Sequence, residues 1–172
     1  MMKRFLYLAF VVMLLPAAPL AAESTGENPL DRIAWMVGTW IGEKKAADGT
    51  PEIVEVTFDW AGHKKIIFYK ISSKQEDRTT TITEGMCGWH PGKKQLVLWE
   101  FDNEGNLYES VMVVHGNKQS YEEMLYQANG ATTPVRAEVI RENDNRFSFK
   151  AFVPKNGEWP EVFHLTYDRV RN

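Results

Sequence analysis

The decisive stretch of this 172-residue sequence is Asn28-Pro29-Leu30-Asp31-Arg32-Ile33-Ala34-Trp35-Met36-Val37-Gly38-Thr39-Trp40-Ile41-Gly42. It opens on a residue that caps helix N-termini, followed by a proline that suits the first helical position. The apolar residues at helical spacing are Leu30, Ile33, Ala34 and Val37. Gly38 is a typical residue for ending a helix. The stretch therefore predicts one short helix that passes directly into a strand opened by Trp40.

From Thr39 onward the apolar period changes to two, which is typical of strands with one buried face. Val54, Val56, Phe58 and Trp60 show it most clearly, because they alternate with mostly polar residues. Further strand-like runs follow every 10–12 residues or so, with Gly-, Pro- and Asn-rich turns between them. The last run contains Phe163–Tyr167. We predict an all-β fold, an antiparallel up-and-down barrel of about ten strands whose first and last strands meet.

The first residues have the order of a secretory signal peptide. Lys3 and Arg4 precede the apolar run Phe5–Leu15, which is shorter than the roughly 20 residues that span a bilayer, and small residues follow. We predict a signal peptide over residues 1–22, with cleavage after Ala22 or after Ser24, and an uncleaved anchor as the alternative. Residues 23–27 then form a polar leader, and residues 28–172 form a single barrel domain.

The charge of the chain limits the classes of molecule it is expected to bind, and its cysteine content limits its disulfides. The chain has 20 Lys and Arg against 23 Asp and Glu, and removal of Lys3 and Arg4 makes the remainder more acidic. Because phosphate binding needs clustered cations, nucleic acid is not an expected partner. The single cysteine, Cys87, has no partner for an internal disulfide and is expected to be a buried, inert thiol. We expect a periplasmic or secreted protein without stable membrane insertion after cleavage, and a homodimer remains open.

Three segments carry a resemblance to a known class of barrels. They are Ala34–Gly42, the Cys87-Gly88-Trp89-His90-Pro91 block with the apolar run Gln95–Phe101 after it, and His164–Arg169. The first resembles the entry strand of the calycin barrels, in which a Gly-x-Trp stands at this place. All three together resemble the nitrobindin-like barrels and a related group of secreted bacterial lipocalin-like proteins of unknown function.

The resemblance implies a possible cofactor. Nitrobindin-like proteins bind haem through a histidine of the last strand, and the matching position here is Val162, with His164 two residues further on. Two residues keep the same face of a strand, so His164 is the candidate haem ligand. The alternation opposes it, because Phe163, Leu165 and Tyr167 form the apolar face and His164 points outward if they fill the interior. We therefore expect no cofactor and keep haem as the alternative.

Aromatic residues and methionines supply the candidates for a ligand-binding interior. They fall on predicted strands and include Trp40, Phe58, Trp60, Tyr69, Met86, Trp89, Trp99, Met112, Phe147 and Phe149. Such residues either line a cavity for a small apolar molecule or fill the core, and both arrangements can hold at opposite ends of one barrel.

Catalysis has a weaker basis in the sequence. Glu84 and Glu100 lie on apolar strands, and a carboxylate in an apolar interior has a raised pKa that suits a general base. No nucleophile elbow, phosphate-binding loop or dinucleotide fingerprint is present, and the histidines lack metal-ligand spacing. We predict an exported barrel that binds a small apolar molecule without catalysis. A haem protein and an acid–base enzyme using Glu84 or a neighbour are the alternatives.

Overall fold

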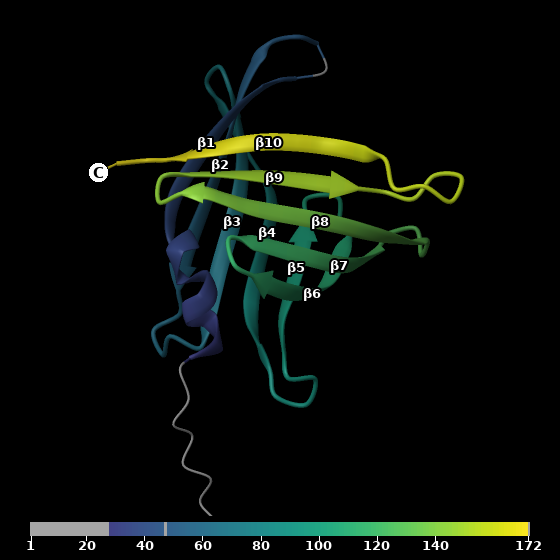
Figure 1. The fold of residues 1–172 in the computed structure, drawn as a ribbon. Helices are drawn as coiled ribbons and strands as arrows, with labels where there is room; N and C mark the ends of the chain where they lie inside the picture. The colour runs from purple at the N-terminus through teal and green to yellow at the C-terminus, as the bar shows by residue number, and fades with distance from the viewer. Residues whose placement is uncertain (1–27, 47, 172) are drawn as a thin grey trace, which may run out of the picture.

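The computed structural model describes residues 28–46 and 48–171, which form one closed antiparallel barrel of ten strands, as the sequence predicts. In chain order the strands are β1 (Gly38–Lys45), β2 (Pro51–Trp60), β3 (Ile66–Gln75), β4 (Arg78–His90), β5 (Gln95–Asp102), β6 (Leu107–His115), β7 (Lys118–Tyr126), β8 (Thr132–Asn143), β9 (Arg146–Phe152) and β10 (Glu161–Arg169). Each strand pairs with the next, and β10 returns to β1. The steep strands β1–β4 are crossed by β8–β10 (Figure 1).

The predicted helix is present as a 3₁₀-helix, η1 (Pro29–Met36), rather than an α-helix. The side chain of Asn28 accepts a hydrogen bond from the backbone N–H of Leu30 (3.3 Å), which confirms the predicted cap. Because a 3₁₀-helix has about three residues per turn, its buried residues are Leu30, Ile33 and Met36. The expectation that Ala34 and Val37 complete the apolar face is thereby corrected, since both are only half-buried.

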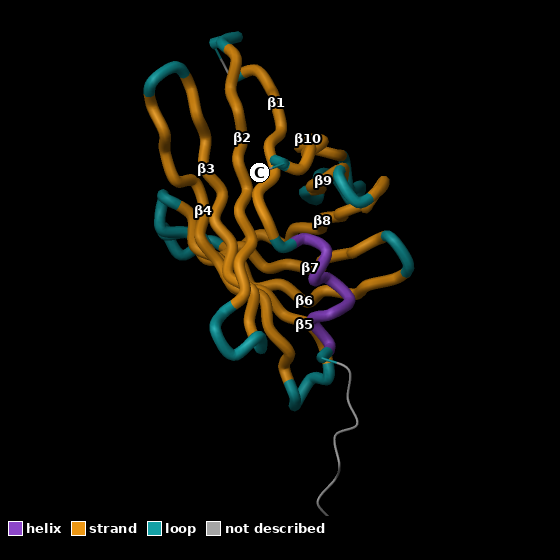
Figure 2. Tube along the Cα trace, turned by 90° about the vertical axis from the view of Figure 1, so that its left-hand side faces the viewer, coloured by secondary structure: helices purple, strands orange, loops and turns teal. Residues whose placement is uncertain are grey.

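η1 closes one end of the barrel. The side chain of Asn28 donates a hydrogen bond to the carbonyl of Lys64 in the β2–β3 turn, and Arg32 donates one to the carbonyl of Val114 near the end of β6. Figure 2 shows the helix against this end, which we call the helix end. The opposite end, where the β5–β6 and β7–β8 turns lie, is called the mouth end.

An arginine and a tryptophan join the helix to both closing strands. The guanidinium of Arg169 on β10 donates hydrogen bonds to the carbonyls of Val37 (2.8 Å) and Trp35, and it lies 4.0 Å from the ring centroid of Trp40 on β1. The indole N–H of Trp40 donates to the carbonyl of Met36 (2.7 Å). These contacts matter because β1 and β10 share only two paired positions, Trp40 with Arg169 and Ile41 with Asp168.

The interior differs between the two ends. Toward the helix end most inward side chains are packed, although Trp60 and Trp89 keep accessible surface, and the largest side chains with almost no exposure are Trp40, Phe147, Leu30, Ile33, Ile67 and Gln119. Trp40 and Phe147 meet edge to face with ring centroids 4.9 Å apart. Other inward-facing side chains stay partly accessible: Phe58 near the helix end, Leu98 and Phe149 at mid-strand, and Glu100, Tyr108, Glu123, Leu125 and Phe163 toward the mouth end. The barrel therefore has a packed base and an open upper half.

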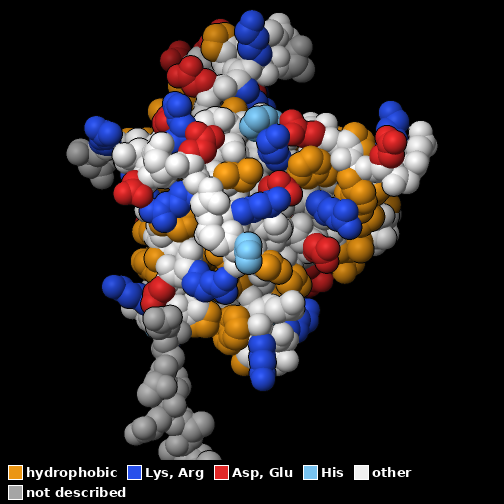
Figure 3. Space-filling view, in the orientation of Figure 1, with side chains coloured by type: hydrophobic (Ala, Val, Ile, Leu, Met, Phe, Trp, Pro, Cys, Tyr) orange, Lys and Arg blue, Asp and Glu red, His pale blue; other side chains and the backbone are white. Residues whose placement is uncertain are grey.

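The predicted signal peptide and polar leader, residues 1–27, lie outside the described residues. Within the described range, no helix has the length and apolar character needed to cross a membrane. On the face drawn in Figure 3, Lys and Arg side chains lie among Asp, Glu and apolar side chains.

Substitution of Gly38 tests how the barrel is closed. Gly38 has a φ of +123°, and a Cβ there would lie 2.7 Å from Nη1 of Arg169. We expect Gly38→Ala to lower the free energy of unfolding by about 3 kcal/mol, because backbone strain adds to displacement of the guanidinium. Urea titration followed by circular dichroism measures the change.

Gly130→Ala is the matched control. Gly130 also has a positive φ (+87°), but nothing lies within 4 Å of the added Cβ. Its loss should stay near 1 kcal/mol, the cost of backbone strain alone. Equal losses for the two variants would show that the contact with Arg169 does not stabilise the closure.

Candidate functional site

A cavity of about 610 Å³ opens at the mouth end. Its walls come from β4–β7 and from the β5–β6 and β7–β8 turns, and the residues are Ile82, Thr83, Asp102, Asn103, Glu104, Asn106, Tyr108, Leu125, Gln127, Ala128 and Asn129. Four of them, Thr83, Asp102, Tyr108 and Leu125, belong to the inward face of the barrel. The mouth cavity is therefore the upper part of the barrel interior.

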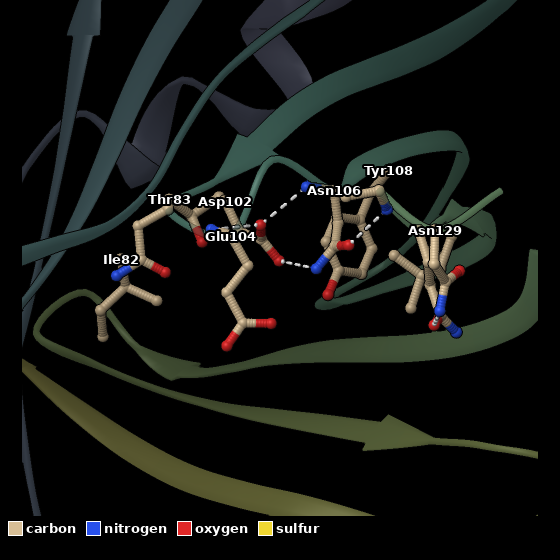
Figure 4. Close-up of a pocket in the computed structure, with 11 residues that line it drawn as sticks. Ile82, Thr83, Asp102, Glu104, Asn106, Tyr108 and Asn129 are labelled. Carbon is tan, nitrogen blue, oxygen red and sulfur yellow. Dashed lines mark hydrogen bonds between the residues drawn. The ribbon is translucent and has the colours of Figure 1, made fainter. Parts of the chain in front are cut away.

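Hydrogen bonds hold the rim of this cavity in place. The carboxylate of Asp102 accepts bonds from the backbone N–H groups of Glu104 and Asn106 (both 2.9 Å) and from the Asn106 side chain (2.7 Å). The side-chain oxygen of Asn106 then accepts from the backbone N–H of Ala128 in the β7–β8 turn (3.0 Å). Figure 4 shows Asp102, Asn106 and Asn129 along this rim. These bonds join the β5–β6 turn to the β7–β8 turn, so the mouth is already formed without a ligand.

Directly below the rim, a tyrosine and a glutamate meet across a glycine. Tyr69 on β3, Gly85 on β4 and Glu100 on β5 are register partners on the inward face. A Cβ at Gly85 would lie 2.6 Å from Cζ of Tyr69 and 2.7 Å from Cβ of Glu100, so only glycine leaves room for this contact. The hydroxyl of Tyr69 crosses the gap and donates a hydrogen bond to Glu100. Burial raises the pKa of Glu100, and this bond partly offsets the rise.

A second glutamate completes what we call the acid pair, Glu100 and Glu123. Glu123 on β7 pairs with Ser110 on β6, which in turn pairs with Leu98, so the two glutamates face the same interior from either side of β6. Burial raises the pKa of Glu123 to about 8, the charge of Glu100 adds to the rise, and a hydrogen bond from Ser110 opposes it. Glu123 is therefore mostly protonated at neutral pH.

Tyrosines surround the acid pair. Burial, followed by the charges of Asp102, Glu100 and Glu123, raises the pKa of Tyr108 to about 12. Burial also raises the pKa of Tyr121 well above its ordinary value, and the hydroxyl of Tyr121 donates a hydrogen bond to Oε1 of Gln119 (2.5 Å). The hydroxyl groups of Tyr69, Tyr108 and Tyr121 therefore stay neutral throughout the physiological pH range.

Another inward glutamate, Glu52 on β2, shows the opposite behaviour. Its carboxylate accepts a hydrogen bond from Ser73 (2.6 Å) and forms an ion pair with Lys44 (3.2 Å). The bond from Ser73 is the main cause of its lowered pKa, and Lys44 contributes. The difference follows mainly from the bond from Ser73 and from the stronger burial of Glu100 and Glu123, and the cation adds to it, since no Lys, Arg or His of the described residues forms an ion pair with Glu100 or Glu123.

The predicted interior residues divide between the two faces of the sheet. Pairing places eight of them on the inward face: Trp40, Phe58, Trp60, Tyr69, Trp89, Met112, Phe147 and Phe149. Trp40, Met112 and Phe147 are packed core rather than cavity wall, and Trp89 is 40% exposed near the helix end. Met86 and Trp99 face outward, which corrects the expectation for both. The reason is that Gly85 holds the inward position beside Met86, and β5 is apolar on both faces.

Met86 and Trp99 line an outer groove of about 520 Å³ together with Phe68, Phe101 and the Lys70–Glu84 ion pair. Glu84 thus faces solvent, with its carboxylate 3.6 Å from the Lys70 amine. This placement corrects its candidacy as an interior base.

The other two residues considered from the sequence, His164 and Cys87, do not line the cavity either. His164 pairs with Lys150, and its Nδ1 lies 3.6 Å from the carboxylate of Glu161 on the outer face, opposite to Phe163, Leu165 and Tyr167. It cannot reach haem inside the barrel. Cys87 is buried on the inward face, where burial raises the pKa of its thiol to about 12, so it stays protonated.

Glu123 was not among the candidates from the sequence. On β7 the inward residues Gln119, Tyr121 and Glu123 are as polar as the outward Ser120 and Glu122, so the apolar period gives no direction. Only the register of neighbouring strands identifies the inward face. Glu100 was noted as a strand carboxylate, and its partner Tyr69 was named only as an aromatic wall residue.

Comparisons with known proteins support the fold alone. The chain is similar to a solved structure. It is that of Rv2717c from M. tuberculosis, with a TM-score of 0.58 and 16% sequence identity, over 83% of this chain and 97% of that chain. No protein-family model and no curated protein matches the sequence. A barrel fold is compatible with ligand binding, and at this identity the likeness carries no information on ligand or catalysis.

The pH dependence of stability tests the environment of Glu123. Its pKa rises from 4.5 to about 8 on folding, so the folded protein holds a proton that the unfolded chain releases between these values. The resulting stabilisation is complete below pH 4.5 and is lost as the pH rises through 8. We expect the free energy of unfolding to fall from pH 5 to pH 8, and Glu123→Gln to flatten this slope by up to about 1.4 kcal/mol per pH unit.

Glu122→Gln is the control, because Glu122 is the exposed neighbour on the outer face of β7. Its slope should match that of the natural protein in urea titrations between pH 5 and pH 8. An unchanged slope in Glu123→Gln would contradict the assignment of Glu123 as a buried acid.

Proposed function

We propose that this protein is an exported barrel of the calycin kind that binds a small molecule in its interior without catalysing a reaction. The observation that carries the proposal is the uneven packing of the barrel. Trp40, Phe147 and Ile67 are buried in the packed part of the interior, whereas Tyr108 and Leu125 on the inward face keep accessible surface and line a formed cavity. Protein interiors are normally close-packed, so a cavity of this size favours a space for a ligand over a simple core.

The dimensions and lining of the interior support a small ligand. Sites for small molecules usually measure roughly 300–1,000 Å³ and combine apolar walls with a few fixed polar groups. The mouth cavity has about 610 Å³; Ile82, Tyr108, Leu125 and Ala128 give it apolar wall, and the polar side chains of its rim, among them Asp102, Asn106 and Asn129, make up the rest. The acid pair and Ser110 lie below it as polar groups. An apolar molecule with one polar end would fit this arrangement.

Neither alternative gains support from the geometry. Haem binding depended on His164, which faces outward beside Glu161. Acid–base catalysis was assigned to Glu84 or a neighbour, and Glu84 faces outward beside Lys70, whereas Glu100 faces the interior. The acid pair has the raised pKa that such chemistry needs, and we assign it to ligand recognition rather than to catalysis.

Obstruction of the mouth tests the proposal. N-phenyl-1-naphthylamine, a neutral apolar dye whose fluorescence rises on transfer from water, should bind the natural protein. Leu125→Trp adds bulk on the inward face beside the cavity, and we expect it to weaken dye binding at least tenfold in a fluorescence titration.

Met124→Trp is the matched control, because Met124 is the next residue of β7 and faces outward. It should leave dye affinity within twofold of the natural value, and circular dichroism should show both variants folded. Equal effects of the two substitutions, or no saturable dye binding by the natural protein, would contradict a ligand site inside the mouth.

A further inference from the structure

The acid pair differs from the ion-paired carboxylates of the barrel in having no cation. Those carboxylates have partners from neighbouring strands: Glu52 with Lys44, Glu55 with Lys74, Glu138 with Lys118, Glu161 with Lys150 and Asp168 with Arg146. Within the described part of the chain, Glu100 and Glu123 form no such pair, although both are surrounded by protein. Burial of two carboxyl groups without a cation is costly, so a group that supplies positive charge there would be bound favourably.

The acid pair is also accessible from the cavity. Both glutamates face inward and keep part of their surface exposed, and each precedes by two residues a cavity-lining residue on the same strand face, Asp102 and Leu125 respectively. A molecule in the mouth cavity would therefore have the acid pair directly beneath it. The Tyr69 hydroxyl fixes one oxygen of Glu100, and Ser110 is the register partner of Glu123 on the same face, so the Glu100 carboxyl group is held in place while acceptor sites remain free.

The aromatic surroundings suit a cation rather than an anion. Tyr69, Tyr108 and Tyr121 lie close enough to the acid pair for its charge to act on their hydroxyl groups. A neutral tyrosine hydroxyl oxygen can accept a hydrogen bond from an ammonium group. An anionic ligand would meet two carboxyl groups and no Lys or Arg.

We propose that the ligand of this barrel is a small amine, whose protonated nitrogen lies between Glu100 and Glu123 while its apolar part occupies the mouth cavity. This inference rests on the function proposed above and specifies the chemical class of the ligand. An ammonium beside Glu123 favours its ionised carboxylate, so a proton leaves Glu123 for solvent as the amine enters at neutral pH. No bond in the ligand is formed or broken.

Three molecules that differ only in the terminal group test the proposal: phenethylamine, 2-phenylethanol and 3-phenylpropanoate. We expect isothermal titration calorimetry at pH 7 to show that the amine binds at least tenfold more tightly than the alcohol, with the carboxylate weakest. Titration in two buffers of different ionisation enthalpy should show proton release with the amine and none with the alcohol. The ratio of amine to alcohol affinity should fall to about one in Glu100→Gln/Glu123→Gln and persist in Glu122→Gln.

The outcomes separate this inference from the function on which it rests. Alcohol binding without a preference for the amine, or a preference that survives in Glu100→Gln/Glu123→Gln, overturns the amine proposal and leaves a ligand-binding interior. Failure of all three molecules and of the neutral dye to bind overturns both. Circular dichroism and urea titration confirm that each variant is folded, so a lost preference reports recognition rather than unfolding.

Discussion

The interaction on which the barrel depends is the contact of Arg169 with the helix and the first strand. β1 and β10 share only two paired positions, whereas the other neighbouring strands share six or more. Backbone pairing is therefore weakest between β1 and β10, where the sheet closes. The guanidinium compensates by donating to the carbonyls of Trp35 and Val37 and by stacking on Trp40. It satisfies carbonyl groups at the end of η1 and ties the last strand to the first in one contact.

The closed helix end determines where a ligand has access. Trp40, Phe147 and the buried residues of η1 seal one end with interlocking rings, so the interior communicates with solvent through the mouth. The polar groups follow the same division. Gln119 and Tyr121 satisfy one another in the packed region, whereas Glu100 and Glu123 lie where the interior opens. The packed residues that stabilise the fold lie toward the helix end, and the polar groups available to a ligand lie toward the mouth end.

The fold was largely predictable, and the site was not. The cap at Asn28, the glycine after the helix and the alternation of Val54, Val56, Phe58 and Trp60 are local signals, and each corresponds to the structure. The acid pair depends on the register of β3 to β7, with Tyr69 and Glu100 meeting only because Gly85 lies between them. Residues on β5 and β7 carry no usable period, since β5 is apolar on both faces and β7 is polar on both. The irregularity of the β3–β4 pair lies between Ile71 and Ser72, so Gly85 itself stands in regular pairing.

The central claim is that the barrel interior holds a ligand on its mouth side only. The most direct measurement is the set of nuclear Overhauser contacts between bound 2-phenylethanol and protein methyl groups. The structure predicts contacts to Leu125 and Val135, which face the upper interior, and none to Ile33 or Val139 in the packed base. Contacts confined to the outward-facing methyl groups of Met86 and Val113 would contradict the account, because the ligand would then lie on the surface of the barrel.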